Sequence, residues 1–305
     1  MAYTTIILYI IALALVAYKA VSVKDTKELL LFMALLVASW LLFNYEGYSA
    51  ITTTLLSGFI IFNAITSFYG KAWGSALLLL AAYYLFATWG ISAGIVLQSA
   101  VIGALSTTRM YSKSKHRKAE AKVENMRNIF QIAAGVFFIL LFIFVQQQYA
   151  SILLLLVFMA GVAISNYTMS SKNGGVFDVL SRMEREGFDF GHGAFWLGVG
   201  ALFAAAFLNA NMVLVVFSAI FFGDSFSTIL GVHYGHVKLP YNKKKSVIGT
   251  ASYFAIVLLM SFPILSYLAL PVAALAALVE SLPIPLDDNF DVSLVLSIIL
   301  QLFLV

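Results

Sequence analysis

The sequence predicts an all-α fold, a polytopic transmembrane bundle of about 10–12 spans. Hydrophobic residues make up 62% of the 305-residue chain and charged residues only 10%, whereas a soluble domain carries about 25% charged residues. Apolar runs recur from one end to the other, and no long polar stretch between them could form a soluble domain. Cysteine is absent, which excludes disulfides, iron–sulfur clusters and thiolate zinc sites.

Each expected span is a run of roughly 20 mostly apolar residues, the length that crosses the hydrocarbon core of a bilayer. Several runs are short or rich in glycine, and in the region 73–107 the count can fall to eleven or ten. The twelve expected spans are residues 3–22, 28–44, 49–67, 73–89, 91–107, 129–147, 150–168, 193–209, 211–232, 247–263, 265–281 and 290–305.

The distribution of basic residues tests this arrangement. With the N-terminus outside, all 18 lysines and arginines fall on the inner side, as the positive-inside rule requires. The net charge of +4 therefore reflects topology, and we expect no nucleic-acid partner. We divide the chain into an N-terminal transmembrane region at 1–107, a basic cytosolic linker at 108–126, and a second region at 127–305 that holds nearly all polar clusters.

Asp224 is the only formally charged residue between Phe190 and Val237. A carboxylate near the centre of a membrane helix costs about 2.5 to 3.5 kcal/mol, so such a group usually has a counter-charge, a metal ion or a proton to transfer. Asp224 can bind Mg²⁺, which favours one or two carboxylates together with phosphate oxygens. The alternative is a structural aspartate paired with a lysine.

The counter-charge is expected from the loop that follows. Lys243, Lys244 and Lys245 directly precede a span, and Ser246 can serve as the N-cap of that helix. A helix N-terminus adds N–H groups that bind anions, so this segment suits a triphosphate. The alternative is that the basic triplet only anchors the topology.

Further polar clusters fall on the same inner side. Adjacent carboxylates in the loop after the span that ends near residue 281 could hold a second metal ion or a ribose; alternatively, Asp288 or Asn289 only caps the last span. A mixed-charge segment at 182–193 and an arginine at the start of the span at 129–147 complete the set. Its candidate residues are Glu280, Asp287, Asp288, Asn289, Glu186, Asp189 and Arg127. One-sided clustering fits a cytosolic phosphate-bearing co-substrate better than a transporter, which spreads ionisable groups through the membrane depth.

Several of these motifs, in this order and spacing, resemble the CTP-dependent polyprenol kinase family, which includes dolichol kinase and the phytol and farnesol kinases. The resemblance covers about residues 127–305. Where the family often has Arg-Lys and then His, this chain has Arg127, Asn128 and Gln131, so we retain only Arg127 from that motif. The segments that carry the resemblance are Gly223–Gly231 with Gly235, Lys238–Gly249, Val279–Ile284 with Asp287–Asn289, and Arg185–Gly193.

The resemblance implies an integral-membrane kinase that transfers the γ-phosphoryl group of CTP to an isoprenoid alcohol such as dolichol, phytol, geranylgeraniol or farnesol, with Mg²⁺ as cofactor. The charge topology places the site on the cytosolic side, and a plasma membrane or an endoplasmic reticulum would both fit it. The expected partners are CTP, the alcohol and the lipid bilayer, and a homo-oligomer is left open. The expected catalytic residues are Asp224, Glu186 and Asp189. The expected phosphate-binding residues are Lys243, Lys244, Lys245, Ser246, Ser225, Asn242 and Arg127. The expected metal ligands are Asp224, Glu280, Asp287, Asp288 and Asn289.

Two alternatives remain open. A CDP-lipid synthase is the natural rival, but those enzymes typically carry a His-Gly-Gly motif and an Asp-Arg-x-Asp motif, and the sequence contains neither. A membrane transporter or a non-catalytic scaffold would fit the number of spans. It fits less well with carboxylates and lysines gathered on one side.

Overall fold

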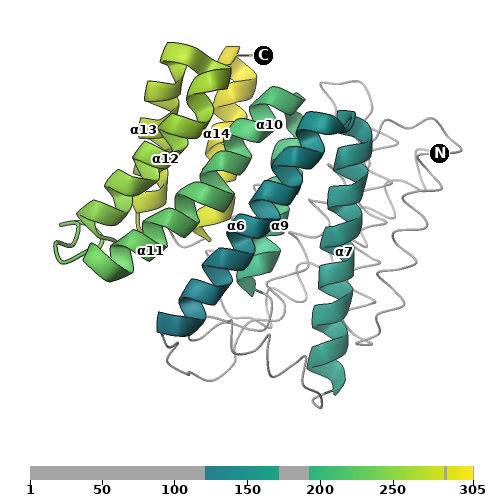
Figure 1. Cartoon of the computed structure of the whole chain (residues 1–305), viewed down its shortest axis with the longest axis horizontal. Helices are drawn as coiled ribbons and strands as arrows, with labels where there is room; N and C mark the ends of the chain where they lie inside the picture. The colour runs from purple at the N-terminus through teal and green to yellow at the C-terminus, as the bar shows by residue number, and fades with distance from the viewer. Residues whose placement is uncertain (1–120, 172–191, 285–286, 305) are drawn as a thin grey trace, which may run out of the picture. The chain divides into compact units, whose positions relative to one another are not determined.

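The computed structural model describes residues 121–171, 192–284 and 287–304. The chain forms two compact units, one made of 117–154, 179–186 and 192–305 and the other of 1–116, 155–178 and 187–191. The described residues form helices joined by short connections, apart from an isolated β-bridge between Lys238 and Ser246 (Figure 1). The prediction of an all-α fold is confirmed for these residues, and the first five expected spans lie outside them.

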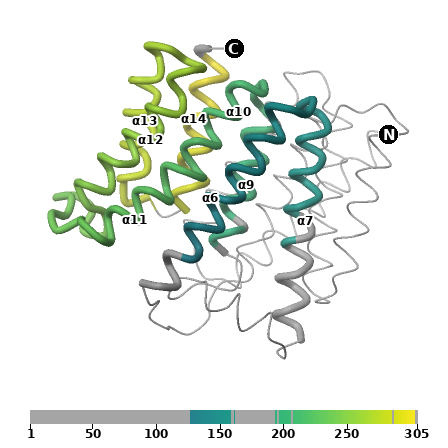
Figure 2. Tube along the Cα trace, viewed as in Figure 1, coloured from purple at the N-terminus to yellow at the C-terminus, as the bar shows by residue number. Residues whose placement is uncertain are grey.

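The helices of the first unit follow the expected spans closely (Figure 2). The expected span at 211–232 is one continuous helical rod made of three consecutive elements, α10, η2 and α11. The elements are α6 (Ala121–Phe144), α7 (Gln147–Ser171, which extends into the second unit), α9 (His192–Phe207), α10 (Ala210–Phe217), η2 (Ser218–Gly223), α11 (Asp224–Tyr234), α12 (Val247–Leu265), η3 (Ser266–Leu268), α13 (Ala269–Ser281) and α14 (Asp288–Leu304).

Three helical stretches of the described residues are long and apolar enough to cross a membrane: Met126–Phe144, Ala210–Tyr234 and Val247–Ser281. The last of these is 35 residues long but is not straight. Pro263 lies in the last turn of α12, and Ser266 has a φ of 53° and a ψ of −129°, which reverses the chain. Helices α12 and α13 then pack against each other as a hairpin, so the two spans expected at 247–263 and 265–281 are separate helices.

The rod α10–η2–α11 is the centre of this unit, since every residue from Val215 to Ser225 is buried. Phe138 and Phe142 of α6 pack against Phe217, with ring centroids 6.5 and 5.2 Å apart. Aromatic pairs at such distances contribute beyond the area they bury. The core therefore encloses the segment that leads directly into Asp224.

The element η2 is a π-helix, a local widening that is often found at functional sites. At its end, the N–H of Asp224 donates to the carbonyl of Ala219, five residues back in the chain. The carbonyl of Ile220, which an α-helix would use here, instead accepts a hydrogen bond from Gln131 Nε2 of α6 at 2.8 Å. The π-helix thus ties α6 to the rod next to the buried carboxylate.

Glycine at position 135 allows α6 to approach the rod, and this predicts a destabilising substitution. A Cβ added at Gly135 would lie 2.6 Å from Phe221 Cβ and 2.9 Å from Phe222 Cε2. Overpacking of this kind costs about 1–3 kcal/mol, which exceeds the gain of about 1 kcal/mol that alanine gives over glycine in a helix. We expect Gly135→Ala to lower the midpoint of thermal unfolding in detergent, followed by circular dichroism.

The matched control is Gly161→Ala in α7, where an added Cβ meets nothing within 4 Å. This variant should unfold at the same temperature as the wild type or slightly higher, because only helix propensity changes. Equal behaviour of the two variants would contradict the close contact between α6 and the rod.

Candidate functional site

Asp224 begins α11, and only 5% of its surface is exposed. Its Oδ2 accepts a hydrogen bond from Gln131 Nε2 at 3.0 Å. The same amide nitrogen also donates to Ile220, so Gln131 is fixed by two contacts. Gln131 is therefore a site residue that the sequence analysis set aside, although a polar residue in an apolar span was a signal for it.

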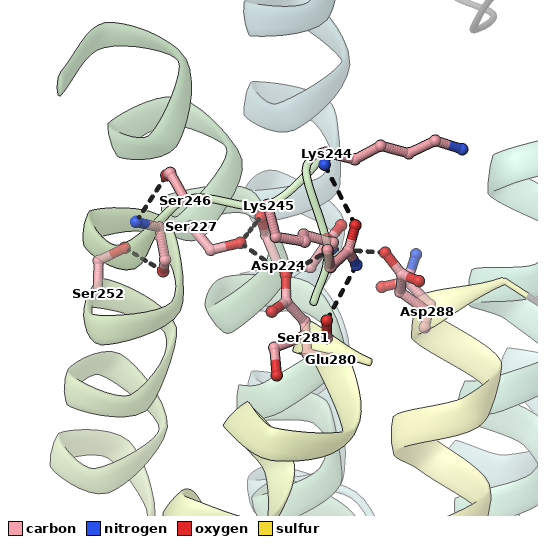
Figure 3. A network of polar contacts seen from close by, with 12 residues as sticks. Asp224, Ser227, Lys244, Lys245, Ser246, Ser252, Glu280, Ser281 and Asp288 are labelled. Atoms are coloured by element: carbon pink, nitrogen blue, oxygen red, sulfur yellow. Dashed lines mark hydrogen bonds and ion pairs between the residues drawn. The ribbon is translucent and has the colours of Figure 1, made fainter. Parts of the chain in front are cut away.

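Next to Asp224, two carboxylates contact the ammonium group of Lys245 (Figure 3). Lys245 Nζ lies 2.6 Å from Glu280 Oε1 at the end of α13 and 2.6 Å from Asp288 Oδ2 at the start of α14. Glu280 is almost completely buried, at 2% exposed, and the hydroxyl of Ser227 also lies 3.4 Å from its Oε1. The ion pairs of the lysine triplet are thus made by Lys245 with Glu280 and Asp288, whereas the expected counter-charge role toward Asp224 is limited to the electrostatic influence of Lys245.

The loop between α11 and α12 decides which lysine points inward. The bridge between Lys238 and Ser246 closes the loop as a tight turn. Asn242 is buried in this turn; its Nδ2 donates to the carbonyl of Ser281 at 2.9 Å, and its Oδ1 accepts from the backbone N–H of Lys244 at 3.2 Å. Asn242 thus fastens the loop to the end of α13. As a result Lys243 and Lys244 are exposed, and the Lys244 side chain extends away from the carboxylates.

Electrostatics keep Lys245 charged. Burial by itself lowers the pKa of an ammonium group. Here the nearby carboxylates of Glu280, Asp288 and Asp224 outweigh burial and raise the pKa of Lys245 well above its usual value. One ammonium group thus contacts two carboxyl groups and is influenced by a third, so the cluster can accept further positive charge.

Ser246 confirms the expected N-cap of α12, since its Oγ accepts a hydrogen bond from the N–H of Gly249 at 3.1 Å. Glycines bring α11 close to this cap. A Cβ added at Gly231 would lie 3.1 Å from Ser246 Oγ, and one added at Gly235 would collide with the same hydroxyl. The glycines of this segment therefore serve close packing around the start of α12.

The remaining expected residues are placed as follows. The hydroxyl of Ser225 is buried and donates to the carbonyl of Phe221, so its phosphate-binding role stays a prediction without a supporting contact. Arg127 lies partly buried on α6. In the alternative interpretation Asp288 or Asn289 caps the last span; the structure gives that position to Asp287, whose Oδ1 accepts from the N–H of Asn289 at 3.1 Å, and the metal-binding role of these residues stays a prediction. Glu186 and Asp189 lie outside the described residues.

The fit of these residues to Mg²⁺ can be tested on their donor atoms. In the part of the chain that the structure describes, no three His, Asp or Glu side chains come together as a preformed metal site. Mg²⁺ needs only one or two carboxylates when phosphates supply further ligands. Glu280 Oε2 is buried and has no hydrogen-bond partner among the described residues, and Asp224 lies nearby. These two carboxylates fit an ion that arrives with a nucleotide.

The described residues form an all-helical bundle with membrane-length helices and a partly buried carboxylate–lysine cluster where α11, α12, α13 and α14 meet. This chain is similar to curated proteins that are named as kinases of the isoprenoid alcohols phytol and farnesol. It is 39% identical to a probable chloroplastic phytol kinase of Triticum aestivum over an alignment of 90 residues, and the match covers 24% of this chain and 30% of the relative.

Two further relatives come from Arabidopsis thaliana. A chloroplastic farnesol kinase is 35% identical over 28% of this chain and 34% of its own length, and phytol kinase 1 is 33% identical over 27% and 38%. The matched stretch spans about a third of the length of these relatives. No family model and no solved structure matches the chain. The predicted resemblance to the polyprenol kinase family is thereby supported over about a quarter of the chain.

Proposed function

We propose that this chain is an integral-membrane kinase that transfers the γ-phosphoryl group of CTP to an isoprenoid alcohol. The observation that carries the proposal is the position of Lys245 between Glu280 and Asp288, beside the buried carboxylate of Asp224. The names of the relatives as phytol and farnesol kinases support the acceptor class. CTP as the donor comes from the family resemblance.

Phosphoryl transfer depends mainly on positioning and on neutralising the charge of the phosphates. In the proposed mechanism, exposed Lys243 and Lys244 attract the nucleotide, and Lys245 completes the phosphate site at the start of α12. The alcohol oxygen forms a bond to the γ-phosphorus, the bond between that phosphorus and the β–γ bridging oxygen breaks, and CDP leaves. Asp224 accepts the proton of the hydroxyl, with Glu186 and Asp189 as the other candidate bases.

Mg²⁺, when bound, neutralises phosphate charge, and Asp224 and Glu280 are the residues that would hold it. Asp287, Asp288 and Asn289 lie at the start of α14, from which they would complete the pocket. The three long apolar helices fit a protein embedded in a bilayer, which is where substrate and product reside. The positive-inside distribution of basic residues supports a cytosol-facing cluster, which either a plasma membrane or an endoplasmic reticulum would allow.

The test is to incubate purified protein with Mg²⁺, a panel of alcohols (phytol, farnesol, geranylgeraniol and dolichol), and CTP labelled at either the α- or the γ-phosphate. Label from the γ-position in the lipid supports the kinase, and unlabelled ATP and GTP added in competition report donor preference. Label from the α-position in the lipid means a CDP-lipid synthase. Failure of both labels to enter any lipid would contradict the kinase and favour a carrier or scaffold.

A further inference from the structure

Asn128 is a fully buried polar side chain of α6. It is 0% exposed, and neither its Nδ2 nor its Oδ1 has a hydrogen-bond partner in the part of the chain that the structure describes. Most buried side-chain polar atoms are hydrogen-bonded, because burial without a partner costs free energy, and an exception calls for an explanation. Both ends of this carboxamide can therefore hydrogen-bond to a bound molecule.

The position of Asn128 on α6 relates it to the site. Asn128, Gln131 and Gly135 are spaced three and four residues apart and therefore share one face of the helix. Along this face Gly135 meets Phe221 and Gln131 meets Asp224, so α6 and the rod run antiparallel. Asn128 lies one helical turn before Gln131. In an antiparallel pair this puts it opposite the part of α11 that follows Asp224 in the sequence.

This places Asn128 and Lys245 on different sides of the central carboxylate. Lys245 comes from the loop before α12, and its partners lie on α13 and α14. Asn128 comes from α6, which packs on α10, η2 and α11 and reaches Asp224 through Gln131. If the phosphates occupy the lysine side, the α6 side is left for the group that receives the phosphoryl.

The chemistry of Asn128 and the apolar outer surface of α6 favour an alcohol with a hydrocarbon tail. On the other faces of this part of α6, Met126, Ile129 and Phe130 are exposed at 43%, 61% and 59%. A lipid chain can pack against such side chains. A neutral carboxamide offers one acceptor and a donor, which matches a hydroxyl group, and it has no charge with which to attract a phosphate.

We propose that Asn128 is an acceptor-binding residue, which holds the hydroxyl of the isoprenoid alcohol beside Asp224. This proposal rests on the kinase function proposed above. It makes Asn128 a determinant of alcohol affinity and leaves nucleotide affinity to the lysine loop.

The experiment measures γ-phosphoryl transfer to farnesol at varied farnesol and varied CTP in detergent micelles. Asn128→Leu has nearly the same shape and should raise the KM for farnesol about tenfold, as expected for loss of one hydrogen-bonding group. The KM for CTP should change less than about twofold. Asn128→Ser keeps a hydroxyl in place of the amide and should lie between the wild type and Asn128→Leu.

A second measurement does not depend on turnover. Farnesol without nucleotide should raise the unfolding midpoint of the wild type, because a ligand that binds only the folded state stabilises it. Asn128→Leu should lose this rise, although its own midpoint without farnesol should not fall, since it removes a buried polar group that has no partner.

The matched control is Ser297→Ala on α14. Like Asn128, Ser297 has a buried polar group, here a hydroxyl, without a hydrogen-bond partner among the described residues. This variant should leave both KM values and the farnesol-dependent rise unchanged. An unchanged KM for farnesol in Asn128→Leu overturns the proposal, and so does a raised KM for CTP, which would mean that Asn128 contacts the nucleotide. If the wild type transfers phosphate to no alcohol, the proposed function itself has failed.

Discussion

Replacing Asp224 by asparagine is expected to lower γ-phosphoryl transfer to the alcohol by on the order of 100-fold or more, the range for losing one acid–base or electrostatic group in an active site. Asparagine has the same shape but carries no charge and is not a base. It can therefore neither accept the proton of the alcohol nor hold Mg²⁺ as a carboxylate does. Initial rates with γ-labelled CTP, measured at saturating alcohol, check this prediction.

The fold should survive this substitution. The side-chain oxygen of asparagine can accept the hydrogen bond that Gln131 Nε2 now donates to Asp224 Oδ2. The change also removes the negative charge of Asp224 from the neighbourhood of Glu280 and Asp288, which relieves repulsion between like charges. We therefore expect an unfolding midpoint equal to or above that of the wild type. Gain of stability with loss of activity is typical of residues kept for function.

Asp291 provides the control for this comparison. It is as buried as Asp224, at 5% exposed, and lies on α14. Asp291→Asn makes the same chemical change and should lower the rate by no more than a few-fold. If Asp224→Asn retains wild-type activity, Asp224 neither accepts the proton nor binds the metal. If both variants lose activity equally, the loss reflects buried negative charge in general.

The sequence was sufficient to predict the helices of the described residues, because apolar runs with charged ends leave few alternatives in a membrane. It was also sufficient to predict that Asp224 lies near basic residues of the next loop. It could not predict which lysine pairs with the carboxylates. That choice depends on Asn242, whose contact with Ser281 sets the direction of the turn across 39 residues of sequence.

Gln131 shows a second limit. A neutral amide in a helix carries no charge signal, and its partner Asp224 is 93 residues away. The contact also depends on the π-helix at Ser218–Gly223, which leaves the carbonyl of Ile220 to Gln131. Helix type within an apolar run is not encoded in a periodic pattern, so neither the π-helix nor the contact could be predicted. The predicted spans in 1–107 and the predicted roles of Glu186 and Asp189 remain predictions.

The second large effect concerns stability, and it arises from Lys245. Replacing Lys245 by methionine removes the ammonium group 2.6 Å from Glu280 but leaves that carboxylate buried, with only the 3.4 Å contact from Ser227. Breaking a buried ion pair in this way costs about 3–5 kcal/mol. Because the Lys245 and Asp288 side chains are 23% and 27% exposed, we expect the lower end, about 3 kcal/mol. Urea unfolding in detergent, followed by circular dichroism, measures this loss.

The double variant Lys245→Met with Glu280→Gln separates the ion pair from other effects of the lysine. It removes both charges, so the penalty of an unpaired buried carboxylate disappears, and we expect it to recover most of the stability lost in Lys245→Met. A thermodynamic cycle with both single variants then gives the coupling free energy of the pair. Lys244→Met is the matched control, because this neighbouring lysine is exposed and points away from the cluster; its effect should stay within about 0.5 kcal/mol. A coupling free energy near zero would mean that Lys245 and Glu280 do not pair in solution, and the lysine loop would then need another reason to face α13.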